Sequence, residues 1–228
     1  MEFLEKVGRV EKHINSVLNK QTFNIAVDDK TVPGLKVAFI ISKPDPTYNF
    51  YLVTTVTDTQ EFMSEEYCMA LPMDWPLVEK DQANSVLSVE QIYYPFILLL
   101  NIVYGNLNTS LFDGHTVIPS DGANPMFPMF TRYLIKLPVI FDNAFAKYVY
   151  EEPQATEFGG QGAITFFQVF PLFQDEFAFY STLDETDEFV DALIRSGRFL
   201  FDPRSISLFA AKPQKSFFGR IWDNITGG

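Results

Sequence analysis

The chain offers few side chains for covalent or metal chemistry. Among its 228 residues it has one cysteine, Cys68, and two histidines, His13 and His115. A zinc site or a cysteine–histidine nucleophile pair would have to be built from these three, and their spacing matches no metal-ligand or catalytic motif. Cys68 falls in the alternating apolar pattern of a strand, which predicts a buried and unreactive thiol. We therefore expect no metal, no cofactor and no catalytic residue.

Carboxylates are the remaining candidates for acid–base chemistry. The densest groups are Asp175 with Glu176, and the four acids between residues 184 and 188. Adjacent acids on a helix point apart, and acids at a helix start are favoured by the helix dipole, so a solvated helix start is expected here. A carboxylate-based hydrolase stays as an alternative, and it would need two convergent acids with raised pKa values in a deep pocket. The sequence contains no phosphate-binding loop, dinucleotide fingerprint or nucleophile elbow.

The net charge of −12 restricts the kind of partner. Six basic residues and one acid between 195 and 220 give +5, so the remainder carries −17. Acidic proteins repel nucleic acid and attract basic partners, and no nucleic-acid binding is expected. Two interpretations of the charge stay open. It is either a solvated surface with a basic tail or an acidic face that captures a basic protein.

Composition and length predict one domain over residues 1–210. The chain is 47% hydrophobic and 16% aromatic, which is enough for a sizeable core. The N-terminus lacks the pattern of a signal peptide, and the most apolar run, 96–103, is too short to span a bilayer. A cytoplasmic protein without stable membrane insertion is therefore expected. Residues 211–228 form a tail whose apolar residues fall at helical spacing, and a docking helix, a membrane-surface helix and a poorly ordered terminus all stay open.

Apolar periodicity predicts a helix followed by strands in the first part of the chain. The helix covers residues 2–20 and carries His13 on its surface. Runs rich in β-branched and aromatic residues then predict an antiparallel meander of strands over 23–28, 35–42, 48–57 and 67–71.

The second half of the chain is predicted to add further strands and two helices. Strands are expected over 116–118, 130–137, 163–170 and 205–209. The strand at 163–170 is apolar on both faces and is therefore expected at the centre of the sheet. Residues 138–160 are expected to be loop-rich. Helices are expected over 175–182 and 185–196, with Asp184 as a candidate cap of the second.

Two signals compete for the start of the helix over 88–104. Ser88 and Gln91 have the spacing of a capping box, which would leave Pro95 inside the helix. Alternatively, Pro95 is the first helical residue, where its missing N–H costs nothing. We favour a start near Tyr94, because the apolar residues that follow then form one buried stripe.

Several segments, in order, resemble the suppressor-of-fused family. They follow one another over roughly residues 35–209 and are Glu66–Pro72 with Asp74–Leu77, Tyr94-Pro95-Phe96, Asp113-Gly114-His115-Thr116, Phe166–Leu172 with Asp175-Glu176-Phe177, and Asp202-Pro203-Arg204. Family members often have Trp before the proline at the position of Tyr94. Each motif is short, and the match lies in their order and spacing.

The resemblance implies an α+β fold with a mixed, mainly antiparallel sheet flanked by helices. It also implies a role without catalysis, because animal members hold a transcription factor through a bound peptide strand. Short single-domain members are typical of bacteria, where the family is associated with immunity proteins that neutralise polymorphic toxins. The expected partner is therefore a basic toxin domain, and the acidic charge is independent physical support for it. A regulatory scaffold that binds an endogenous peptide stays as the alternative.

The resemblance also suggests where a partner would bind. We expect Trp75, Tyr104, Asp113 and His115 at the partner-binding surface, because turns present side chains, a helix end lies nearby, and exposed Trp and Tyr are natural anchors. A structural reading stays open for two of them. Trp75 would plug the edge of the core, and His115 would hold a turn by hydrogen bonding to the backbone.

Overall fold

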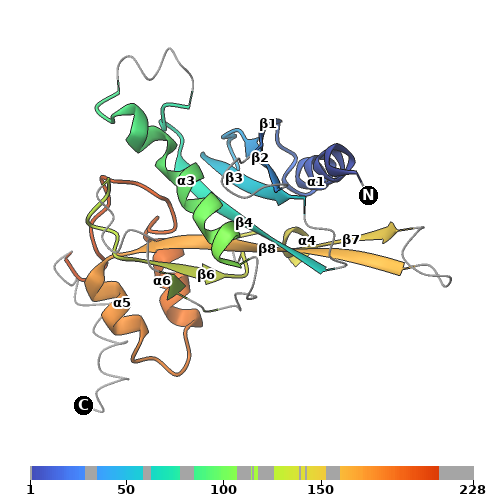
Figure 1. Cartoon of the computed structure of the whole chain (residues 1–228). Helices are drawn as coiled ribbons and strands as arrows, with labels where there is room; N and C mark the ends of the chain where they lie inside the picture. Colours follow the sequence, from blue (N-terminus) through green and yellow to red (C-terminus); the bar gives the residue numbers. More distant parts are fainter. Residues whose placement is uncertain are drawn as a thin grey trace.

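A mixed β-sheet forms the centre of the molecule in the computed structural model (Figure 1). The structure describes residues 2–28, 35–58, 63–77, 85–106, 114, 116–117, 126–138, 140–141, 143–152 and 160–210. The strands are β1 (Thr22–Asp28), β2 (Lys36–Ser42), β3 (Phe50–Thr57), β4 (Met63–Pro72), β5 (Thr116–Val117), β6 (Arg132–Lys136), β7 (Lys147–Glu152) and β8 (Gly160–Leu172). Their order in the sheet is β1-β2-β3-β4-β8-β6-β5, and β7 also pairs with β8.

Helices cover the sheet on both faces. They are α1 (Phe3–Leu18), α3 (Val89–Asn106), α4 (Asn143–Ala146), α5 (Gln174–Tyr180) and α6 (Asp187–Arg195). Among the described residues, no helix combines the length and the apolar character that crossing a membrane would need. The α+β class and the mixed sheet flanked by helices are confirmed.

The first four strands form the predicted antiparallel meander. The chain then continues through α3, β5, β6, α4 and β7 before it reaches β8. This strand lies parallel to β4 in a register that pairs Met63 with Ala163 and Cys68 with Gln168. The opposite edge of β8 pairs with β7 over residues 160–165 and with β6 over residues 168–172. The prediction of a central strand at 163–170 is therefore confirmed.

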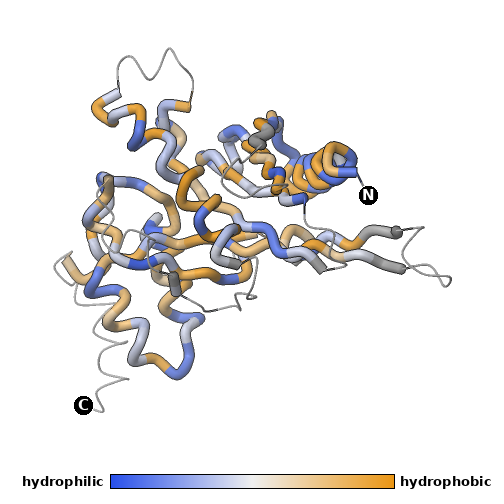
Figure 2. Tube along the Cα trace, viewed as in Figure 1, coloured by the Kyte–Doolittle hydropathy of each residue, from blue (hydrophilic) through white to orange (hydrophobic). Residues whose placement is uncertain are grey.

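Alternate residues along the strands pack under different helices. Phe39, Val53 and Val169 belong to the core under α3, whereas Ile40, Leu52 and Phe166 belong to the core under α1. Since successive side chains of a strand point to opposite faces, α1 and α3 cover opposite sides of the sheet. Figure 2 shows hydrophobic and hydrophilic positions alternating along the turns of α1, as expected for a helix that buries one side.

A third cluster places α6 on the same face as α1, further along β8. Phe170 and Leu172 of β8 pack with Phe189 and Leu193 of α6. These β8 positions are an even number of residues from Phe166, which packs under α1. The C-terminal helices therefore extend the layer that α1 begins, and α3 is the only helix among the described residues that covers the other face.

The structure corrects the predicted start of the long helix. It begins at Val89, and Pro95 lies inside it. The capping box is formed, because the Ser88 amide donates to Gln91 Oε1 at 2.9 Å and the Gln91 amide donates to Ser88 Oγ at 3.3 Å. Ile92, in the turn before Pro95, is fully buried. Capping and burial of the first turn therefore offset the backbone hydrogen bond that Pro95 cannot donate.

Three other local predictions were wrong. Residues 138–160, expected to be loop-rich, contain α4 and β7, because β8 extends past the end of β6 and pairs with β7 there. Residues 205–209 form no strand, since 205–207 have no regular structure and 208–209 lie in a turn, and Leu200 makes an isolated parallel bridge to Ala70. The N-cap of α6 is Thr186 and not Asp184.

Candidate functional site

The outward face of α3 carries an apolar stripe. Val89, Tyr93 and Ile97 have exposed fractions of 57%, 44% and 47%. They are four residues apart, so they lie one above another along the helix. The opposite side of α3 is buried in the core through Ile92, Phe96, Leu99, Ile102 and Val103. A helix that is apolar on its exposed side as well as its buried side is typical of a surface that receives another molecule.

Tyr104 lies at the C-terminal end of the same face. It is seven residues after Ile97, which brings it back to the same side after about two turns. The ring is partly buried against the core under α3, and its hydroxyl makes no hydrogen bond within the described residues. The predicted residue Tyr104 therefore lies on the same side of α3 as Val89, Tyr93 and Ile97, but its hydroxyl is buried and it adds little to the exposed stripe.

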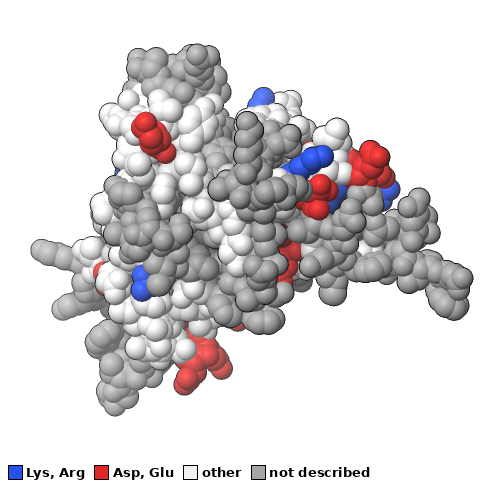
Figure 3. All heavy atoms as spheres, in the orientation of Figure 1, with Lys and Arg blue, Asp and Glu red and all other residues white. Residues whose placement is uncertain are grey.

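Few charged side chains surround the stripe. In the orientation of Figure 1, the described surface over α3 is mostly uncharged, and charged side chains gather over α1 (Figure 3). Glu90 is the acid in the first turn of α3, and the last turn has no basic residue. This face therefore offers apolar contacts to a partner, and negative charge lies elsewhere on the protein.

Trp75 is buried beneath α3 and is 4% exposed. Its Nε1 donates to the carbonyl oxygen of Ile92 at 3.2 Å, and its ring contacts Phe127 and Phe201. The sequence left two roles open for Trp75, and this is the one in which the side chain fills the edge of the core. A direct contact between Trp75 and a partner stays a prediction, whereas its support of α3 is seen directly.

Asp113 and His115 lie outside the described residues, but Gly114 between them is described. Its φ angle is 85°, in the left-handed region that favours glycine. Its amide donates to the carbonyl oxygen of Ile135 at 2.8 Å, and its own carbonyl accepts from the Tyr180 hydroxyl at 2.9 Å. The glycine of the Gly-His-Thr motif is thus fixed between β6 and α5.

Replacing Gly114 with alanine is expected to destabilise the protein by about 1–2 kcal/mol. A Cβ atom would require a strained backbone angle and would lie 3.2 Å from the Tyr180 hydroxyl. Gly8→Ala is the matched control, since that Cβ would meet nothing within 4 Å, and alanine favours the helix α1. Denaturant unfolding followed by circular dichroism measures both. Equal effects of the two substitutions would contradict the assignment of strain to Gly114.

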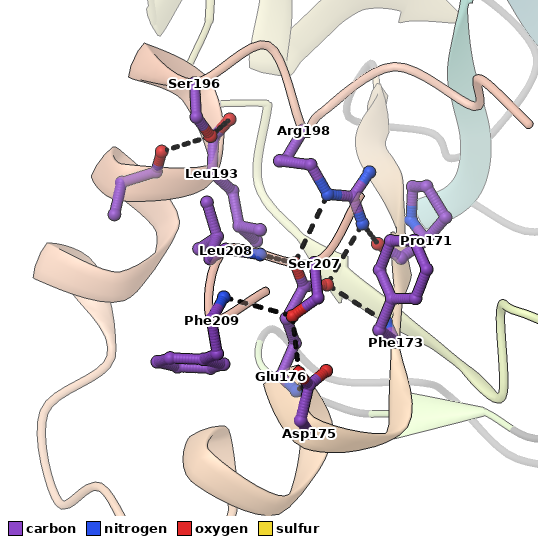
Figure 4. Close-up of polar contacts among 11 residues, drawn as sticks. Pro171, Phe173, Asp175, Glu176, Leu193, Ser196, Arg198, Ser207, Leu208 and Phe209 are labelled. Atoms are coloured by element: carbon purple, nitrogen blue, oxygen red, sulfur yellow. Dashed lines mark hydrogen bonds and ion pairs between the residues drawn. The ribbon is translucent and has the colours of Figure 1, made fainter. Parts of the chain in front are cut away.

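The acids of α5 play a structural role that the sequence analysis missed. Glu176 was expected to be solvated, but it is fully buried and forms an ion pair with Arg198 (Figure 4). Arg198 Nη2 donates to Glu176 Oε2 at 3.0 Å, and Nε donates to Oε1 at 3.2 Å. Asp175 points elsewhere and accepts a hydrogen bond from Ser207 at 2.6 Å. Adjacent acids do point apart, but only one of them faces solvent.

Two segments that carried the family resemblance meet at the surface. Arg204 donates through Nη2 to Asp74 Oδ1 at 2.9 Å and through Nε to Asp202 Oδ1 at 2.9 Å. The guanidinium holds the pKa of Asp74 below its ordinary value through this hydrogen bond. The Asp-Trp-Pro motif and the Asp-Pro-Arg motif, 130 residues apart, are therefore joined.

Of the three residues considered for nucleophile or metal chemistry, Cys68 and His13 lie within the packed structure, and His115 lies outside the described residues. Cys68 is fully buried, as predicted, and burial raises the pKa of its thiol. His13 was expected at the surface, but its ring is half-buried. It lies tilted against the Tyr148 ring and stacked on the Phe166 ring, with centroids 4.7 and 5.9 Å away. Within the described part of the chain, no three His, Cys, Asp or Glu side chains gather to hold a metal ion.

Comparison with known proteins identifies the architecture. No protein-family model and no curated protein matches the sequence. A SUFU (suppressor of fused protein) homolog from Neisseria gonorrhoeae superposes with a TM-score of 0.55 at 13% identity, over 90% of this chain and 97% of that one. A chain of the Sufu–Fu complex superposes with a TM-score of 0.59 at 14% identity, over 92% of this chain and 94% of that one. The chain therefore has the suppressor-of-fused-like fold that its motifs predicted.

Proposed function

We propose that this protein is a non-catalytic protein-binding module of the immunity type, which neutralises a toxin in the cytoplasm by occupying its surface. The observation that carries the proposal is the exposed apolar stripe of α3, formed by Val89, Tyr93 and Ile97. Aromatic and aliphatic side chains on a rigid helix lose little conformational entropy on binding and are frequent anchors of protein interfaces.

The similar fold in the Sufu–Fu complex supports a protein as the partner. The charge supports a basic one, since the chain carries −12 and a toxin that acts on nucleic acid tends to be basic. Opposite charges on two proteins accelerate their encounter, and apolar contact at the interface then slows dissociation. Steering by the acidic surface and anchoring by the stripe would therefore act at different stages of binding.

Lack of catalysis is part of the proposal. The side chains best suited to chemistry are committed elsewhere, with Cys68 buried, Glu176 paired with Arg198 and Asp175 bonded to Ser207. We expect no turnover of small substrates. Turnover that disappears when one buried acid or His115 is changed would overturn this part.

Replacing Ile97 with glutamine is expected to weaken partner binding by about 30-fold, the effect of losing roughly 2 kcal/mol at an interface anchor. Ile25→Gln is the matched control, because Ile25 is 44% exposed and lies on the edge strand β1. The partner to test is the product of the adjacent gene, measured by isothermal titration calorimetry against each variant. Circular dichroism confirms that both variants fold.

Co-expression separates immunity from other binding roles. Cells that express the adjacent gene product should survive with the wild-type protein and with Ile25→Gln, and should survive less well with Ile97→Gln. Binding without rescue would favour a regulatory scaffold over an immunity protein. Absence of any complex at micromolar concentrations, together with no rescue, would contradict the proposal.

A further inference from the structure

A shallow groove lies at the end of the molecule that carries α5. Its volume is about 560 Å³, and it is walled by residues before β6, by the first turns of α5 and by the last described segment of the chain. The lining residues are Pro128, Met129, Thr131, Phe173, Gln174, Asp175, Ala178, Ser205, Ile206, Ser207 and Ala210. Of these described residues, Asp175 alone carries a charge, and Ile206 is 61% exposed.

The walls of the groove are fixed by buried polar contacts. The Leu208 amide donates to Glu176 Oε1 at 2.9 Å, and the Ser207 hydroxyl donates to Asp175 at 2.6 Å (Figure 4). These bonds hold the segment 205–210 against α5. Arg198 completes the arrangement, since its guanidinium lies 4.6 Å from the Phe173 ring centroid and is paired with Glu176. The groove is therefore preformed, and a ligand that enters it need not order its walls.

The chain itself supplies a segment whose chemistry fits this groove. Residues 212–228 contain Phe217, Phe218, Ile221, Trp222 and Ile225 at the spacing of one helical face. The segment has three basic residues and one acid, a net charge of +2, which leaves −14 on residues 1–210. Apolar side chains suit the lining, and opposite overall charge favours the approach of the segment.

The tether is short enough for efficient capture. The last described residue, Ala210, is itself part of the groove wall. Phe217 lies seven residues further along the chain, and an extended chain of that length spans up to about 25 Å. A short tether gives an effective concentration in the millimolar range, so even weak apolar contacts would keep the groove occupied.

We propose that the segment 212–228 docks into this groove of its own chain, with Trp222 and its apolar neighbours against Ile206, Met129 and Phe173. The proposal is independent of the proposed function, because α3 takes no part in it. The groove is then a binding site for an aromatic, basic segment that the chain itself supplies.

Acrylamide quenching of tryptophan fluorescence in the full chain tests the proposal. The chain has two tryptophans, and Trp75 is buried, so Trp222→Phe isolates the Trp75 signal and the difference reports Trp222. We expect Trp222 to be protected in the wild type. In Ile206→Lys its quenching constant should rise by roughly twofold or more, because a docked side chain loses most of its contact with solvent.

Leu4→Lys is the matched control, since Leu4 is 74% exposed on α1, away from the groove, and should leave Trp222 protected. Ala178→Arg, a second change in the groove wall, should act like Ile206→Lys. The proposal is overturned if Trp222 in the wild type is quenched as easily as in a synthetic 212–228 peptide. Protection that disappears on dilution, with a dimer in sedimentation, would assign the occupant to a second copy. Protection seen only with anionic phosphatidylserine vesicles would assign the segment to a membrane surface.

Discussion

Replacing Arg198 with methionine is expected to lower the free energy of unfolding by about 3–5 kcal/mol, a large fraction of the stability of an ordinary domain. The substitution leaves the Glu176 carboxylate buried without its cation, since the side chains of Arg198 and Glu176 are 5% and 0% exposed. The lost guanidinium also donates to the Pro171 carbonyl and lies over the Phe173 ring. Methionine can fill the space but can replace none of these interactions.

Unfolding in guanidinium chloride, followed by circular dichroism, measures this loss of unfolding free energy. Arg195→Met is the matched control, because the Arg195–Asp191 pair is about 60% exposed on α6, and such pairs contribute little. The double variant Glu176→Leu/Arg198→Met should recover part of the loss, since it removes both buried charges. A loss below 1 kcal/mol for Arg198→Met would show that Glu176 finds solvent when its partner is absent.

Replacing Lys6 with methionine is expected to cost about 3 kcal/mol for the same physical reason. Lys6 Nζ lies 3.1 Å from Glu66 Oε1 and 2.8 Å from the carbonyl oxygen of Thr57, and the side chain of Glu66 is 0% exposed. Glu66 keeps hydrogen bonds from the Thr57 amide and from the hydroxyls of Thr55 and Thr57 at 2.9 Å each. These bonds remain in the variant, so the expected loss is at the lower end of the range for a broken buried pair.

The measurement is again denaturant unfolding, with Arg9→Met as the control. Arg9 pairs with Glu5 on the exposed side of α1, so its loss should change stability by less than about 0.5 kcal/mol. Glu66→Gln should cost less than Lys6→Met, because an amide oxygen at the Oε1 position can still accept from Lys6 and from the amide and hydroxyl of Thr57. A Glu66→Gln variant that is less stable than Lys6→Met would contradict the assignment of the cost to an unpaired buried charge.

Local patterns in the sequence were sufficient for most of the elements. The meander was predictable, because β-branched and aromatic runs separated by turn residues specify strands through nearest-neighbour preferences alone. The helices α1, α5 and α6 were predictable from apolar spacing. The start of α3 was not predictable, although its capping box was visible. The stability lost by placing Pro95 inside the helix could be weighed against the capping box only once Ile92 was seen in the core.

The candidate site was less accessible to sequence reasoning. Tyr104 was named, but Val89, Tyr93 and Ile97 were not, since the sequence predicted a buried stripe on this helix without showing which apolar residues outside the stripe stay exposed. One signal was present, because α3 has apolar residues all around and a single covering sheet can bury only one side. Trp75 was named as a possible anchor and lies in the core, where its indole N–H bonds to Ile92.

The sequence by itself determined most of the strands and helices, the scarcity of nucleophiles and metal ligands, and the acidic charge, because each depends on residue type and short-range spacing. Only the tertiary structure decided that β8 lies parallel to β4, about 100 residues earlier, and that Glu176 meets Arg198. The packing of the layers decides which residues become partners. In a sequence, a Glu or Arg that lies in solvent cannot be told from one that lies in a buried pair. The exposed stripe of α3 has the same origin, since burial belongs to the assembled layers and not to the helix alone.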